Sequence, residues 1–170
     1  DTSSNASQLF SYRYDGLGRV DLSQSCIDGR CFEVQMGFDL AGRISSIRYP
    51  DPKGNISTAS ERLNYVYGEA GFLDSLPGYV NLFKYNASGN CTYIQFMNGI
   101  EELHPYDPLR GWNTGLEVNL KAGRQLFSQT VLHDKVGRVL QQAITGQGSS
   151  QTDTYSHDDL GRLTQVSSTD

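Results

Sequence analysis

A short motif recurs along the whole chain. Residues 14–20 read YDGLGRV, and three further segments keep the same order: an aromatic residue or His, Asp, two free residues, Gly, Arg and an aliphatic residue. Three looser copies complete the series. A self-similar chain of this kind is expected to fold as a repeat architecture. The seven copies lie near residues 14–20, 38–44, 67–73, 85–91, 106–112, 133–139 and 157–163.

Each strict copy has the residues of a β-hairpin. Tyr12 and Tyr14 alternate with other residues, as side chains on one face of a strand do. Asp at the first turn position and Gly at the fourth favour a type I turn, in which the Asp oxygen accepts from a backbone N–H two residues on. The Arg and the aliphatic residue then begin the return strand. The predicted turn residues are Asp15, Gly18, Arg19, Asp39, Gly42, Arg43, Asp134, Gly137, Arg138, Asp158, Gly161 and Arg162.

The looser copies depart from this pattern in different ways. The copy at Tyr67 lacks both the Asp and the Arg, so its turn is less firmly specified. Asn86 replaces Asp in the fourth copy and keeps the turn chemistry. In the fifth copy Gly moves by one place, and Pro108 takes the second turn position, which suits it.

The composition agrees with β structure and limits the partners. The chain has 170 residues, with eighteen Gly, five Pro and ten Tyr, which favours strands and turns over helices. A net charge of −5 argues against nucleic acid as a partner, because phosphate binding needs a basic face. No apolar run is long enough to cross a bilayer. We expect one all-β domain over residues 1–170, in which seven hairpins form a curved antiparallel strip.

The repeated motif resembles the YD repeat of the rearrangement-hotspot (Rhs) superfamily, which includes bacterial Rhs toxins, shell components of insecticidal toxin complexes and the animal teneurins. The resemblance runs from Tyr12 to Val166. It implies that the hairpins join side by side into a strip that spirals into a hollow shell, often around a toxic C-terminal cargo. It therefore implies a scaffold and says nothing about chemistry in this segment. Seven repeats are too few to close such a shell, so a partial shell or barrel is expected.

Two cysteines flank a second turn signal. Asp28-Gly29 is typical of a two-residue hairpin turn. If Ile27 and Arg30 close that turn, Cys26 and Cys31 form the next pair, with Cα atoms roughly 4.5 Å apart. That separation is within disulfide reach, although two reduced thiols are the alternative. Cys91 is left over, either buried and inert or paired with another chain.

Four segments match the acceptor pattern for N-glycosylation. Four matches are a modest excess over chance, and together with a disulfide they favour a secreted protein. The candidate acceptors are Asn5, Asn55, Asn86 and Asn90.

No catalytic, cofactor or metal constellation stands out in the sequence. His133 and His157 occupy the aromatic position of their repeats, where a structural role is the simpler interpretation. Glu101 and Glu102 are adjacent on an expected strand, so they point to opposite faces and make a poor acid–base pair. We therefore expect a protein that is not an enzyme, with no cofactor and no metal site.

The many tyrosines leave two interpretations open. Exposed rings along a strip could stack on sugars, which would make the chain a carbohydrate-binding or adhesion module. Alternatively the rings stack on one another across neighbouring strands, at roughly 0.2–1 kcal/mol for each pair. Trp112 is the aromatic residue that best suits a ligand-facing position.

The ends of the strip suggest a function. Residues 1–10 and 163–170 contain no Pro or Lys, the residues that protect open sheet edges. We therefore expect copies of the chain to associate by strand addition into an extracellular filament. A segment of a larger Rhs shell that encapsulates a toxin is the main alternative.

Overall fold

The computed structural model describes residues 8–121, 123–146 and 148–169, and this part of the chain is all-β without a helix. The predicted architecture of antiparallel β-hairpins is confirmed. Backbone contacts divide the chain into two units, Asp1–Pro77 and Gly78–Asp170. The expectation of a single domain stays a prediction.

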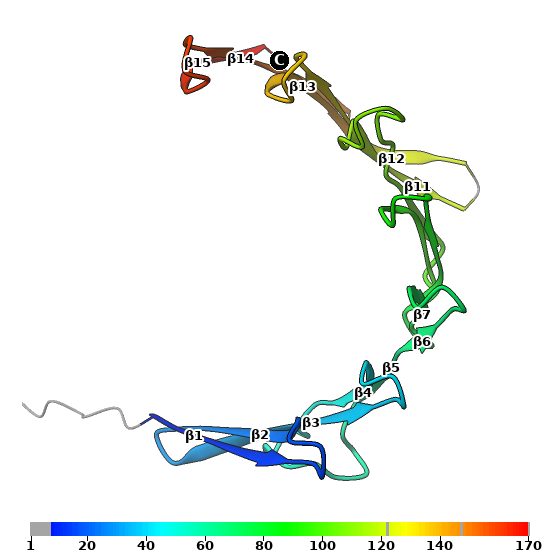
Figure 1. Ribbon diagram of the computed structural model, residues 1–170, viewed down its shortest axis with the longest axis vertical. Helices are drawn as coiled ribbons and strands as arrows, with labels where there is room; N and C mark the ends of the chain where they lie inside the picture. Colours follow the sequence, from blue (N-terminus) through cyan, green and yellow to red (C-terminus); the bar gives the residue numbers. More distant parts are fainter. Residues whose placement is uncertain (1–7, 122, 147, 170) are drawn as a thin grey trace, which may run out of the picture. The chain divides into compact units, whose positions relative to one another are not determined.

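The first unit contains a five-stranded sheet and a two-stranded sheet (Figure 1). The order in the larger sheet is β1-β2-β3-β4-β5, so every strand pairs with its neighbour in sequence, and all pairs are antiparallel. Strands β6 and β7 form the smaller sheet. The strands are β1 (Gln8–Tyr14), β2 (Val20–Ile27), β3 (Arg30–Phe38), β4 (Ile44–Arg48), β5 (Arg62–Asn64), β6 (Val66–Tyr67) and β7 (Leu73–Ser75).

The second unit contains one eight-stranded antiparallel sheet in the order β15-β14-β13-β12-β11-β10-β9-β8. Here too each strand pairs with the next one along the chain. The strands are β8 (Val80–Tyr85), β9 (Cys91–Phe96), β10 (Ile100–Leu103), β11 (Gly115–Leu120), β12 (Gln125–His133), β13 (Val139–Gly146), β14 (Ser149–His157) and β15 (Leu163–Thr169).

This topology places the repeat turns along one edge of each sheet. In a sheet whose strands pair in sequence order, successive turns must alternate between the two edges. The turns of the second unit's repeats join β8 to β9, β10 to β11, β12 to β13 and β14 to β15. They therefore lie together at one end of the strands, which we call the repeat edge, as distinct from the open edge that an outer strand forms. The intervening turns lie at the opposite end of the strands. In the five-stranded sheet, the β1–β2 and β3–β4 turns likewise share a repeat edge.

Strand register explains the aromatic and aliphatic positions of the motif. Tyr14 lies directly opposite Val20, with a bulge between Arg13 and Tyr14. Cross-strand pairs of an aromatic and a branched residue are among those that stabilise a sheet. Five of the other six repeats place equivalent residues opposite one another: Phe38 and Ile44, Tyr67 and Leu73, Tyr85 and Cys91, His133 and Val139, and His157 and Leu163. In the repeat with the extra turn residue, Tyr106 instead lies opposite Asn113.

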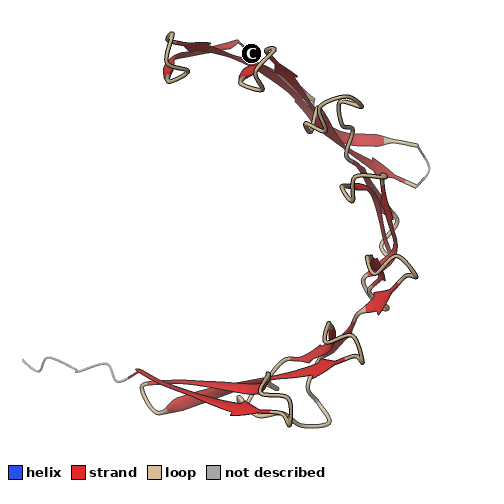
Figure 2. Cartoon of the chain, viewed as in Figure 1, coloured by secondary structure: helices blue, strands red, loops and turns tan. Residues whose placement is uncertain are grey.

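The two larger sheets are single layers, which leaves little room for a core (Figure 2). Among the described residues, Val80 is the buried apolar side chain, with 5% exposed, and no side chain is less than 2% exposed. A globular domain buries one face of its sheet against a second layer. Here the sheet faces stay half-exposed, so strand pairing and contacts between turns have to provide the stability.

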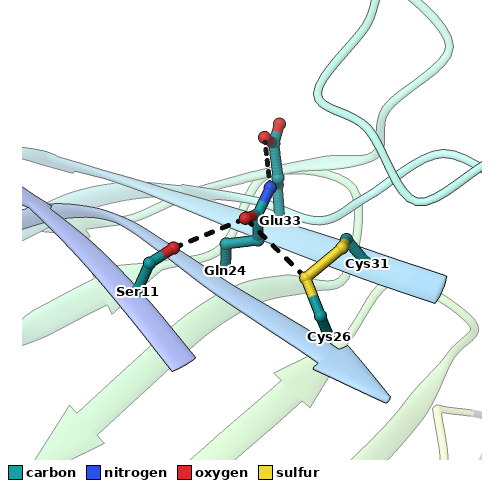
Figure 3. Close-up of a disulfide and its surroundings, with 5 residues drawn as sticks. All are labelled: Ser11, Gln24, Cys26, Cys31 and Glu33. Atoms are coloured by element: carbon teal, nitrogen blue, oxygen red, sulfur yellow. Dashed lines mark hydrogen bonds between the residues drawn. A yellow bond between two sulfur atoms is a disulfide. The ribbon is translucent and has the colours of Figure 1, made fainter. Parts of the chain in front are cut away.

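Cys26 and Cys31 lie in register at the end of the β2–β3 hairpin and form a disulfide, with Cα atoms 4.0 Å apart. Ile27 and Arg30 close the turn between them. Figure 3 shows the disulfide beside Gln24, whose Oε1 lies 3.8 Å from Sγ of Cys26. A disulfide sulfur carries no proton, so this is a polar contact and not a hydrogen bond.

A row of polar side chains crosses three strands beside this disulfide (Figure 3). Ser11 lies opposite Gln24, and Gln24 lies opposite Glu33. The Ser11 hydroxyl donates to Gln24 at 3.4 Å, and the Gln24 amide donates to Glu33 at 3.1 Å. The other Glu33 oxygen accepts from the Ile56 N–H at 3.3 Å. The row thus ties β1, β2 and β3 to the loop that follows β4.

The disulfide leads to a direct prediction. A non-reduced digest should release Cys26 and Cys31 in one linked peptide, identified by mass spectrometry. Replacing both by Ser should lower the free energy of unfolding by roughly 2 kcal/mol, because the cross-link restricts the unfolded chain. Cys91→Ser is the matched control and should change little. Quantitative alkylation of Cys26 without a reductant would contradict the pairing.

Candidate functional site

The repeat turns hold a recurring set of side-chain contacts. In the first turn the Asp15 N–H donates to the Arg19 carbonyl at 2.8 Å, and the Gly18 N–H donates to the Asp15 carbonyl at 3.0 Å. Gly18 has φ of 78°, where a residue with a Cβ is strained. This is a three-residue hairpin loop with a glycine bulge.

The Asp carboxylate organises this loop from within. Oδ1 of Asp15 accepts from the N–H groups of Leu17 at 2.9 Å and Arg19 at 3.0 Å. Its Oδ2 accepts from Nε of Arg19 at 2.7 Å. One carboxylate therefore holds the turn and the first residue of the return strand together. The same three contacts recur at Asp39 with Ala41 and Arg43, at Asp134 with Val136 and Arg138, and at Asp158 with Leu160 and Arg162.

The looser copies keep the backbone frame of the turn. Asn86 uses its Oδ1 as Asp does, accepting from Ser88 and Asn90 at 3.0 Å each. The Gly68 turn has the two backbone bonds without a side-chain acceptor. In the Asp107 turn, the extra residue moves the closing bond to the Trp112 carbonyl.

The residue after the turn glycine, which we call the post-glycine residue, reaches the next turn of the repeat edge. Arg19 lies 4.3 Å from the ring centroid of Phe38. Arg43 lies 4.2 Å from the ring of Tyr67 and donates to the Gly71 carbonyl at 3.3 Å. A site in which one carboxylate holds the cation and a ring lies beneath it suits the planar guanidinium of Arg better than the ammonium of Lys. The aromatic positions of these repeats are therefore joined through arginine, where the sequence suggested ring-to-ring stacking.

The second unit repeats this arrangement. Arg138 donates to the Asp158 carbonyl at 3.5 Å, one turn further along the edge. Trp112 is the post-glycine residue of its own repeat, and its ring lies 5.4 Å from that of His133. A Cβ on Gly137 would come within 2.9 Å of the indole, so this turn needs glycine for space as well as for its φ of 94°.

Trp112 also has a cation over its ring, because Arg110 lies 5.1 Å from the indole centroid. The structure thus uses Trp112 to connect two turns. A ligand-facing role for Trp112 stays a prediction.

The turn carboxylates have lowered pKa values. In the Asp15 turn, the backbone and side-chain hydrogen bonds from Arg19 lower the pKa of the carboxyl. For Asp134, partial desolvation raises the pKa, but the hydrogen bonds from the side chain and backbone of Arg138 and from Val136 outweigh it and lower the pKa to about 2. Asp39 and Asp158 shift in the same direction. These carboxylates are therefore anionic at neutral pH, as ion-pair partners and not as proton donors.

Glu101 and Glu102 do not form an acid–base pair. Glu101 accepts from the Gln95 amide at 3.0 Å, while Glu102 lies 3.4 Å from Nε2 of His104, so the two carboxylates have separate partners. Within the described ranges, no three His, Cys, Asp or Glu side chains gather as metal ligands do. The same part of the chain has no helix suited to crossing a membrane.

Three of the four candidate glycosylation sites lie in described turn segments. Asn55 is exposed, Asn86 and Asn90 are half-buried, and Asn5 lies outside the described residues. Cys91 is a half-buried free cysteine, and burial raises the pKa of its thiol. Modification of these asparagines stays a prediction.

Two features of the site were missed by sequence reasoning. Asp51 and Gly54 form an eighth turn of the same kind: Oδ1 of Asp51 accepts from Lys53 and Asn55, and the Gly54 N–H donates to the Asp51 carbonyl. The spacing of Asp and Gly in DPKG was the available signal. The other missed feature is that the post-glycine arginine contacts the next turn. The arginine is visible in the motif, but its contact depends on which turn lies beside it.

Two solved structures share the fold of this chain. A Tc holotoxin pore of Photorhabdus luminescens matches 96% of this chain and 11% of its own, with a TM-score of 0.70 and 14% identity. The TcdB2-TccC3 structure without its hypervariable C-terminal region matches 95% of this chain and 9% of its own, with a TM-score of 0.75 and 15% identity. At such identity the likeness concerns the fold, and the chain spans about a tenth of the solved chains it matches. No protein-family model and no curated protein matches the sequence.

The turn carboxylates predict a pH dependence. Asp134→Asn keeps an oxygen for the backbone bonds, as Asn86 does in its own turn, and loses the ion pair. At neutral pH the variant should unfold at a midpoint temperature lower by roughly 2–4 °C.

The sign of this effect follows from the pKa of about 2 in the folded chain against an ordinary value of 3.8. The stabilisation by the carboxylate is fully present above the unfolded value and is lost as pH falls toward 2. Thermal melts from pH 7 to pH 2 should therefore show the two curves converging. Asp159→Asn, in the middle of the next turn, is the control. A difference that stays constant down to pH 2 would exclude the ion pair as its cause.

Proposed function

We propose that this chain, which has the YD-repeat fold of the Rhs superfamily, is a non-enzymatic wall segment of a larger Rhs-type shell. The observation that carries the proposal is the match of nearly the whole chain to about a tenth of two much longer chains from Tc toxin structures. A segment that aligns from end to end within a longer chain of the same fold is well explained as a part of such a wall. By resemblance to the superfamily, the complete shell would enclose a toxic cargo.

The outer strands of the two sheets support this proposal. All residues of β1 and all residues of β15 are exposed. Phe10 and Tyr12 are 53% and 56% exposed, and Leu163 and Val166 are 55% and 49% exposed. Within the described residues, β1 pairs with β2 alone and β15 with β14 alone. Open edges with large apolar side chains are favourable only if further strands cover them.

The single-layer sheets also fit a wall better than an enzyme. Enzyme sites are concave and need a packed scaffold to position their groups. Here the Asp and Arg side chains that form short ion pairs hold the repeat turns together. The proposed role is therefore structural, with the rest of an Rhs shell as the partner.

Self-assembly into a filament is the second candidate. Neither β1 nor β15 contains Pro or Lys, so a second copy could add its strand to either edge. The comparisons favour continuation within a shell over this filament. A carbohydrate-binding module is the third candidate and has less support, because Trp112 contacts Arg110 and His133.

An extracellular location is part of the proposal. Disulfides form and persist in oxidising compartments, and the Cys26–Cys31 pair would be favoured there. Exposed Asn55 is the candidate acceptor best placed for a glycan.

Cryo-electron microscopy of the natural assembly tests this function. We expect the outer edges of β1 and β15 to be hydrogen-bonded to strands of the same polypeptide, and the intact mass to exceed that of 170 residues several times. Edges paired with strands of another copy would replace the shell by the filament. Edges left unpaired in the natural protein would contradict both assemblies.

A further inference from the structure

One turn of the repeat edge lacks the side chain that covers its neighbour. In the strict repeats the post-glycine residue is an arginine, which fills the space between its own turn and the next. In the repeat at residues 85–91 this position is Asn90. The Asn90 side chain is shorter than an arginine and extends only toward Gly111. A Cβ added to Gly111 would lie 4.0 Å from Nδ2 of Asn90.

A groove of about 800 Å³ lies between these two turns. Its walls come from the 85–91 turn and the start of β9 on one side, and from residues 104–111 on the other. Polar and apolar atoms share the lining about equally, and His104 and Tyr106 each contribute a ring. The residues that matter here are Asn86, Asn90, Thr92, His104, Tyr106 and Asp107.

Tyr106 occupies the position that receives an arginine elsewhere. It directly precedes the first residue of its turn, as Phe38 precedes Asp39 and Tyr67 precedes Gly68. Those two rings have Arg19 and Arg43 over them. Among the described residues, no Lys or Arg lies over the Tyr106 ring.

The groove also has the acceptors for such a cation. The Asp158 carbonyl accepts both the Gly161 N–H of its own turn and the side chain of Arg138. The equivalent Asp107 carbonyl accepts the Gly111 N–H at 2.8 Å and has a second lone pair. The Asp107 carboxylate adds negative charge, because hydrogen bonds from the N–H groups of Arg110 and Leu109 lower its pKa.

The other charged groups at the groove leave room for a cation. Arg110 borders it, but its guanidinium lies over the ring of Trp112. Nε2 of His104 lies 3.4 Å from a carboxylate oxygen of Glu102.

We propose that this groove binds a guanidinium group, supplied as the arginine side chain of a partner polypeptide. The ligand class follows from the chain itself: Arg19 and Arg43 lie over the rings at the equivalent position of the following turn, and Arg138 donates to the carbonyl of the equivalent turn residue, Asp158. A guanidinium that stacks on Tyr106 and donates to the Asp107 carbonyl would combine these two contacts, a geometry that suits its planar fork of donors better than the compact ammonium of lysine. The proposal does not depend on whether the chain belongs to a shell or to a filament.

Titration of the complete chain with N-acetyl-arginine amide, followed by two-dimensional NMR of the backbone amides, tests the proposal. We expect saturable shifts confined to residues 86–92 and 104–111, and at least tenfold weaker binding of N-acetyl-lysine amide. Equal responses to both compounds would show a non-specific charge effect and would overturn the proposal. So would the absence of a saturable response.

Variants of the chain provide the matched controls. Asn90→Arg should fill the groove from within and abolish binding, and Tyr106→Leu should weaken it several-fold by removing the ring. Arg138→Asn should open the equivalent position over Asp158 and create a second site, with shifts near residues 133–139 and 157–163. Asn98→Arg, at the opposite edge of the sheet, should bind as the natural chain does.

Full binding by a folded Asn90→Arg chain would contradict the assignment of the groove, whatever the other variants do. A glycan on Asn90 in secreted natural material would occupy the groove with sugar and would also contradict it.

Discussion

The ion pair between the Asp and the Arg of each strict repeat is the contact on which the rest of the structure depends. The carboxylate closes the turn through backbone N–H groups and also fixes the guanidinium of the arginine four residues on, as Asp15 does for Arg19. Held in this way, the guanidinium can reach the next turn with little further loss of conformational freedom. The arginine side chain therefore belongs both to the turn of its own hairpin and to the contact with the following hairpin.

The consequence is a chain stabilised from neighbour to neighbour. Single-layer sheets with half-exposed faces cannot rely on a core, and Val80 is the buried apolar residue of the described part. Repeat proteins of this kind gain stability as a sum of repeats and their interfaces. Stability gained in this way lets a sheet extend by adding hairpins without a second layer.

The sequence predicted what depends on local chemistry. Alternating residues, the spacing of Asp and Gly, and the Asp28-Gly29 turn each determine a structure within a few residues, so the hairpins could be derived from them. The position of Arg43 over Tyr67 could not, because it depends on which strands become neighbours across 24 residues of chain. The groove beside Tyr106 was missed for the same reason, since Asn90 is informative only once its neighbouring turn is known.

A double-mutant cycle on Arg19 and Phe38 tests most directly whether these turn-to-turn contacts stabilise the chain. The variants Arg19→Gln, Phe38→Leu and their combination would be compared by urea unfolding. We expect a coupling free energy of roughly 0.5–1 kcal/mol, as for a cation over a partly exposed ring. Arg19→Gln combined with Phe96→Leu, in the other unit, should show additive effects. Additive effects for Arg19 and Phe38 as well would show that the contact between these turns does not stabilise the chain.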